Sequence, residues 1–162
     1  ANMSRNFLNT VLTARNECYE GIRIIRGFYE NNRNPNNILE LEDLYFGKEE
    51  IEKSYSMIEN LDASDAFLDN IKSTALAEIK NFKEGAIIEI NAYERVKTAN
   101  FITKFFQAKN FTNLEKQAIE KFKIAIRFGE KANRKIVDYV KSNSAIFPLE
   151  LCNLLREFYG IE

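Results

Sequence analysis

The sequence contains no histidine, no tryptophan and only two cysteines among its 162 residues. Zinc sites need clustered cysteine or histidine ligands. Catalytic triads built on a histidine base and the Glu-x-x-His pairs of di-iron bundles need histidine as well. Neither a GxxxxGK[ST] loop nor a GxGxxG turn occurs, so the common phosphate-binding motifs are missing. We therefore expect no metal, no other cofactor and no enzymatic activity, with a carboxylate-only active site as the remaining enzymatic alternative.

Proline and glycine are also scarce, with two and six residues. This excludes collagen-like, proline-rich and glycine-rich linker classes and leaves few positions that would interrupt a helix. The hydrophobic and charged fractions, 45% and 29%, are those of a globular chain. Membrane-length apolar runs, a signal peptide, repeats and β-hairpin motifs are missing from the sequence. The length predicts one domain over residues 1–162, in which we interpret residues 1–3 as a cloning remnant followed by a start methionine.

Apolar side chains recur at spacings of three and four, which is the period of an amphipathic helix. This pattern predicts helices over residues 4–29, 48–61, 112–142 and 148–159. Residues 38–46 fit either a short helix or an extended connector. The fold class that follows is all-α: a single-domain antiparallel bundle of five to six helices.

The apolar period hardly falters across residues 65–109. One unbroken helix of this length would measure about 67 Å, which is long for a compact domain. The sequence Lys83-Glu84-Gly85 resembles a helix C-terminus with glycine just after its last turn. Residues 91–94 fit the capping-box pattern of a helix start. We therefore predict two helices, or one sharply kinked helix, with the break at residues 83–91. A better capping box at residues 112–115 predicts the start of the following helix, whose inward face includes Ile126.

Gly21 and Cys18 lie on the apolar stripe of the first predicted helix. A glycine inside a helix costs about 1 kcal/mol of helix propensity, so we expect a neighbouring helix to approach closely at Gly21. Cys18 and Cys152 both fall on apolar faces, which predicts small buried thiols in a reducing compartment, with a disulfide between them as the alternative. We predict a cytoplasmic location unless the chain is an excised domain. The frequent asparagine, isoleucine and lysine indicate an AT-rich genome.

Charge is divided unevenly along the chain. Residues 38–93 hold 13 acidic and 5 basic side chains, a net charge of −8, whereas residues 94–142 hold 12 basic and 5 acidic, a net charge of +7. The candidate contacts to an anionic partner are Lys116, Lys123, Arg127, Arg134 and Lys141. Acidic residues alternate with them, which is typical of a solvated helix face. We favour the solvated face, and keep a nucleic-acid contact as the alternative.

The last predicted helix has apolar residues around more than one of its faces. The candidate interface residues are Phe147, Leu151, Leu154, Leu155, Phe158 and Tyr159. One interpretation is that residues 146–162 pack on the open end of the bundle. The other is that the second apolar face binds a partner or forms a homodimer, because exposed apolar patches mark interfaces. We favour packing on the bundle.

Three arginines lie on the first predicted helix. Arg15 lies beside its apolar stripe, and Arg23 and Arg26 come later in the same helix. Arginines in a bundle groove can hold a carboxylate or phosphate ligand, as in a sensor domain. The more ordinary expectation is that they lie along the surface or pair with the acidic segment. Taken together, the sequence predicts a non-enzymatic, regulatory module that works through protein contacts. A nucleic-acid-associated protein and a ligand-sensing bundle are the alternatives.

Overall fold

The structure is a computed structural model that describes residues 2–31, 42–98 and 101–143. Within these residues the regular secondary structure is entirely helical, so the prediction of an all-α fold is confirmed. Four helices are present: α1 (Asn2–Asn31), α2 (Glu42–Glu59), α3 (Ala66–Thr98) and α4 (Phe101–Ser142). The predicted count of five to six helices is not reached in this part of the chain. The predicted last helix, residues 148–159, lies outside it.

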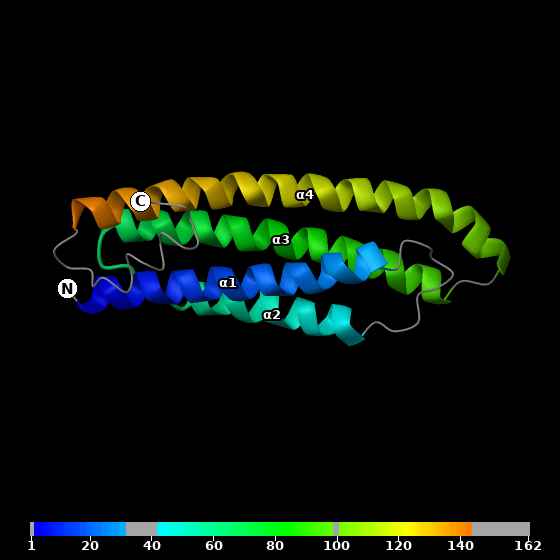
Figure 1. The fold of residues 1–162 in the computed structure, drawn as a ribbon, viewed down its shortest axis with the longest axis horizontal. Helices are drawn as coiled ribbons and strands as arrows, with labels where there is room; N and C mark the ends of the chain where they lie inside the picture. Colours follow the sequence, from blue (N-terminus) through cyan, green and yellow to red (C-terminus); the bar gives the residue numbers. More distant parts are fainter. Residues whose placement is uncertain (1, 32–41, 99–100, 144–162) are drawn as a thin grey trace.

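The four helices lie lengthwise in a bundle in which each helix runs opposite to the one before it (Figure 1). The most extensive contacts join α1 to α2 and α3 to α4, so the bundle is two helical hairpins packed on each other. The first turn of α3 is fixed by Asp65, whose carboxylate accepts a hydrogen bond from the Leu68 amide at 2.8 Å. This is the N-cap interaction that satisfies one of the free amides at a helix start.

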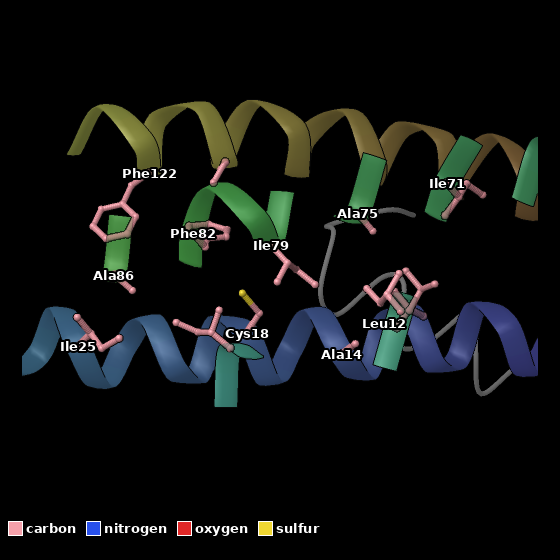
Figure 2. Close-up of a cluster of buried hydrophobic side chains, with 14 of the residues drawn as sticks. Leu12, Ala14, Cys18, Ile25, Ile71, Ala75, Ile79, Phe82, Ala86 and Phe122 are labelled. Atoms are coloured by element: carbon pink, nitrogen blue, oxygen red, sulfur yellow. The ribbon is translucent and has the colours of Figure 1, made fainter. Parts of the chain in front are cut away.

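The hydrophobic core follows the predicted stripes. On α1 it includes Leu12, Ala14, Cys18 and Ile25, which Figure 2 shows in one cluster with buried residues of α3 and Phe122 of α4. On α3 the buried stripe consists of Leu68, Ile71, Ala75, Ile79, Phe82, Ala86, Ile90 and Tyr93. These residues recur at the spacings of three and four from which the helix over residues 65–109 was predicted.

The predicted helix break at residues 83–91 is wrong. Helix α3 continues without interruption to Thr98, and the next helix, α4, begins at Phe101. Gly85 serves a packing role, since a Cβ on it would lie 2.5 Å from Cε1 of Phe122 and 3.1 Å from the carbonyl oxygen of Ala118. The predicted helix start at Thr112 is also wrong, because α4 begins at Phe101 and runs through this position.

Helices α1 and α2 approach each other closely at a pair of glycines, Gly21 and Gly47. A Cβ on Gly21 would lie 2.6 Å from the carbonyl oxygen of Gly47, and one on Gly47 would lie 2.8 Å from the carbonyl oxygen of Gly21. Real Cβ atoms essentially never make such short contacts. The expected close approach at Gly21 is therefore confirmed, and its partner is the backbone of α2.

Candidate functional site

Arg15 lies in the interior of the bundle, with a side-chain exposure of 1%. Its Nε donates a hydrogen bond to Oε1 of Glu78 at 2.6 Å, and its Nη2 donates one to Oε2 at 2.9 Å. The carboxylate of Glu78 is equally buried, at 1%. Two parallel hydrogen bonds of this kind form a bidentate ion pair, which is stronger and more directional than a single contact.

Three further groups accept hydrogen bonds from Arg15. Nη1 donates to Oδ1 of Asn133 at 2.7 Å, and Nη2 donates to the hydroxyl of Tyr19 at 2.8 Å and to the carbonyl oxygen of Gly129 at 3.2 Å. The hydroxyl of Tyr19 in turn donates to Oε2 of Glu78. We call these five residues the Arg15 network. It joins α1, α3 and α4 at the centre of the bundle.

The network rationalises how a charge can lie inside an apolar core. Burying an ion is costly unless it is paired and its remaining hydrogen-bonding groups are satisfied. Here Glu78 supplies the opposite charge, and Tyr19, Asn133 and the backbone of Gly129 supply additional acceptors. The carboxylate of Glu78 thus occupies the position that an acidic ligand of Arg15 would take. This agrees with the more ordinary expectation that the arginine pairs with the acidic segment.

The structure does not bring the three candidate groove arginines together. Arg23 is 74% exposed and pairs with Glu20 at 2.7 Å. Arg26 is partly buried, pairs with the buried carboxylate of Glu89 and lies 5.7 Å from the ring centroid of Phe122. Each of these three arginines, Arg15, Arg23 and Arg26, therefore has its own acidic partner, and two of these partners come from α3.

The sequence offered one unused signal for the network. Glu78 lies three residues after Ala75 and four before Phe82, so it occupies a position on the buried stripe of α3. An acidic residue at such a position needs a buried partner. Asn133 offered no comparable signal, because only the arrangement of the helices in space shows that the Arg15 side chain reaches it.

Gly129 allows Glu78 to lie against α4. A Cβ at this position would collide with Oε2 of Glu78, which Arg15 and Tyr19 hold in place. We expect Gly129→Ala to lower the free energy of unfolding by about 1–3 kcal/mol, because the carboxylate must leave its partners. The matched control is Gly27→Ala on α1, where a Cβ would meet nothing within 4 Å.

This control should gain up to about 1 kcal/mol from helix propensity. Urea denaturation followed by circular dichroism measures both variants. Equal stability changes for Gly129→Ala and Gly27→Ala would contradict the placement of Glu78 against Gly129.

Cys18 is buried beside the Arg15 network and is a free cysteine. Burial raises the pKa of its thiol, and the negative charge of Glu78 raises it further. A thiol with a raised pKa forms little thiolate, which is the reactive species. The expectation of a small buried thiol at Cys18 is confirmed, whereas Cys152 lies outside the described residues.

A second feature is a surface pocket of about 360 Å³ between the start of α3 and the end of α4, which we call the end pocket. Its lining residues are Asp65, Phe67, Asn70, Ile71, Lys135, Asp138, Tyr139, Ser142 and Asn143. The Nζ of Lys135 donates to Oδ1 of Asn70 at 2.6 Å and to Oγ1 of Thr74 at 2.8 Å. Burial lowers the pKa of Lys135, and the nearby charge of Lys131 lowers it further. Phe67 remains 75% exposed.

The outer face of α4 carries the five candidate anion contacts. All five, Lys116, Lys123, Arg127, Arg134 and Lys141, are exposed. The acidic residues Glu120, Glu130 and Asp138 are exposed too, and Glu120 pairs with Lys123 at 3.4 Å. The face therefore carries both signs of charge. Ile126 was expected to point inward but is 51% exposed, so that expectation is wrong.

The candidate interface residues Phe147, Leu151, Leu154, Leu155, Phe158 and Tyr159 lie outside the described residues. Within residues 2–31, 42–98 and 101–143, no cluster of three or more Asp, Glu or Cys side chains is arranged to hold a metal ion. None of the described helices combines the length and apolar character needed to cross a membrane. Comparison with protein-family models, with curated proteins and with solved structures finds no significant match.

Proposed function

We propose that this chain is a non-enzymatic helical-bundle module of the cytoplasm that acts through contacts with another protein. The observation that carries the proposal is an exposed aromatic pair at the start of α2. Phe46 is 56% exposed and the adjacent Tyr45 is 40% exposed. The start of α2 lies in the half of the bundle away from the start of α3 and the end of α4 (Figure 1), which line the end pocket.

The aromatic pair has features of a contact site. The hydroxyl of Tyr45 donates a hydrogen bond to Oε1 of Glu94, so its ring is anchored to α3, and this bond raises the pKa of Tyr45. An anchored ring loses little conformational entropy when a partner binds. Full burial of a phenylalanine such as Phe46 contributes about 1.5–3 kcal/mol. Aromatic residues are also enriched among the residues that dominate binding energy at interfaces.

The interior of the bundle supports the same proposal. The Arg15 network engages its polar groups with one another, and Arg26 pairs with Glu89. A ligand-sensing function would need Arg15 or Arg26 to exchange these partners for the ligand. The arrangement therefore favours a module that recognises its partner with its surface.

The proposal is tested by immobilising the 162-residue chain, incubating it with a lysate of the source organism and identifying the retained proteins by mass spectrometry. The informative variant is Phe46→Ser, and the matched control is Ile126→Ser, which removes an apolar side chain of similar exposure, 51% against 56%, from α4. We expect a partner to be retained by the wild type and the control and to be lost with Phe46→Ser. The proposal would be contradicted if the same proteins were retained by the wild type and by both variants. It would also be contradicted if no protein were retained and sedimentation showed a strict monomer.

The second candidate is a nucleic-acid-associated protein. It is favoured by the exposure of Lys116, Lys123, Arg127, Arg134 and Lys141 along one helix. It is opposed by the acidic side chains between them, because these would repel phosphates. Phosphate contacts make binding weaken steeply with salt. Retention on a polyanion column that falls as salt rises would support this candidate, and no retention at low salt would eliminate it.

A further inference from the structure

Helix α2 surrounds its exposed phenylalanine with acidic side chains. The neighbours of a residue on the same face of a helix are the residues three and four positions before and after it. For Phe46 these positions hold Glu42, Asp43, Glu49 and Glu50, which we call the acidic rim. Glu42, Asp43 and Glu49 are exposed, as Phe46 is, and Glu50 is partly buried. The apolar ring is therefore flanked by negative charge along the helix in both directions.

Basic side chains of the chain do little to neutralise the acidic rim. The two lysines of α2 face other carboxylates, because Lys48 lies 3.8 Å from Glu52, and Lys53 lies 3.8 Å from Glu17 of α1. Among the residues that the structure describes, no basic side chain forms an ion pair with the rim. Glu94 of α3, which holds the aromatic pair by a hydrogen bond, adds a further carboxylate beside it. The surface thus combines an exposed aromatic pair with negative charge that has no partner within the described chain.

Stabilisation of the helix explains only half of the acidic rim. Carboxylates in the first turn of a helix interact favourably with its dipole, which accounts for Glu42 and Asp43. The dipole effect falls off within the first turn, so it does not account for Glu49 and Glu50. A solvated helix face commonly alternates the two signs of charge, as the outer face of α4 does, whereas the rim has one sign. Charge of one sign around an apolar contact gives a surface the means to select its partner.

We propose that this surface binds a basic segment of another protein, in which lysine or arginine side chains flank an apolar residue. The apolar residue packs on Phe46 and Tyr45, and the flanking cations pair with the acidic rim. Arginine can in addition stack on the aromatic rings. This partner chemistry rests on the proposed function, since it requires that the aromatic pair is a contact site. The same carboxylates disfavour nucleic acid and anionic membranes, because they repel phosphate.

A second copy of this chain is a less suitable occupant. Its outer α4 face offers Lys123 and Arg127 beside the exposed Ile126, but Glu120 and Glu130 lie on the same face. Helices α2 and α4 also lie on opposite sides of the bundle (Figure 1). A contact between α2 of one copy and α4 of the next is therefore head-to-tail, and such contacts generate rings or open filaments. A separate basic protein needs no such assembly.

Selection from a random peptide library displayed on phage, with the immobilised 162-residue chain as bait, tests the inference. Peptides that bind the wild type but not Phe46→Ser are the ligands of this surface. We expect them to carry a net positive charge and at least one large apolar residue. Their Kd, measured by fluorescence anisotropy, should rise with salt concentration, because salt screens ion pairs between exposed groups.

Asp43→Lys/Glu49→Lys is the decisive variant, since it reverses two exposed charges of the acidic rim. We expect the Kd of the selected peptides to rise about tenfold or more, because each attraction becomes a repulsion. The variant Asp43→Asn/Glu49→Gln only removes the charges and should give a smaller rise in the same direction. Circular dichroism checks that each variant keeps its helices.

The matched control is Glu120→Lys/Glu130→Lys, which reverses two exposed charges of α4 and gives the chain the same net charge as the decisive variant. It should change the Kd by less than about twofold, because the reversed charges lie on the opposite side of the bundle.

Three outcomes would overturn the inference, and they are distinguishable. Phe46-dependent peptides that are neutral or acidic, or that bind the charge-reversed variant unchanged, would refute a basic partner and leave the contact site intact. If no peptide depends on Phe46, the proposed function fails together with the inference. Self-association of the wild type that Asp43→Lys/Glu49→Lys abolishes in sedimentation would identify a second copy as the occupant.

Discussion

Replacing Glu78 with leucine is expected to lower the free energy of unfolding by about 3–5 kcal/mol. Both side chains are only 1% exposed in the wild type. The substitution therefore leaves the guanidinium of Arg15 buried without its counter-ion. Removal of one member of a buried ion pair costs more than the pair itself contributes, because the remaining charge keeps its desolvation penalty. Tyr19 loses its acceptor in the same step. Urea denaturation measures the loss.

A surface ion pair provides the matched control for Glu78→Leu. Lys121 and Glu84 also join α4 to α3, at 2.9 Å, but each side chain is 39% exposed. Ion pairs of this exposure contribute about 0–1 kcal/mol, because water screens them. Glu84→Leu should therefore change the free energy of unfolding by less than about 1 kcal/mol. Similar losses in the two variants would show that Arg15 finds another way to satisfy its charge.

The second large effect is expected for Gly21→Leu. The side chain would have to enter the space where the Gly47 carbonyl oxygen and Cγ1 of Ile51 lie 2.6 and 2.8 Å from a Cβ on Gly21. A backbone atom cannot move aside as a flexible side chain can, so α1 and α2 must separate. We expect a loss of about 3 kcal/mol or more, at the upper end of the usual cost of overpacking.

Gly27→Leu on the same helix separates this steric cost from the effect of adding a side chain. A Cβ at Gly27 meets nothing within 4 Å. Leucine is a better helix former than glycine, so this control should gain several tenths of a kcal/mol, up to about 1. The measurement is again urea denaturation of both variants. A Gly21→Leu protein as stable as the wild type would contradict the glycine contact between α1 and α2.

Periodicity alone was sufficient for the all-α class and for most of the buried faces, with Ile126 of α4 as an exception. The predicted helix over residues 4–29 became α1 (Asn2–Asn31), and its stripe became its buried face. The second predicted helix, over residues 48–61, began six residues too late, because α2 starts at Glu42. These results follow from the dominance of apolar burial, which the spacing of side chains encodes directly.

Local signals failed where tertiary packing opposed them. Gly85 resembled a helix end, but Phe122 lies against it and α3 continues. The capping box at Thr112 had the right residues, yet α4 passes through it. A glycine in a helix permits both a helix end and a close helix contact, and the sequence alone does not say which applies.

The candidate site was predicted only in part for a similar reason. Arg15 was selected from its position beside the apolar stripe of the first helix. Its partners come from positions 63 and 118 residues away, Glu78 and Asn133, and such pairings depend on how the helices pack. The sequence therefore identified Arg15 as a candidate residue but did not identify the groups that surround it.

The central claim is that Arg15 and Glu78 satisfy each other's charge inside the bundle, so that the pair has a structural role. The most direct measurement is the unfolding free energy of Arg15→Met/Glu78→Leu beside the two single variants. Each single variant should lose about 3–5 kcal/mol, while the double variant should lie within about 1 kcal/mol of the wild type, because no charge is then left buried. A double variant that loses the sum of the two single effects would contradict the claim.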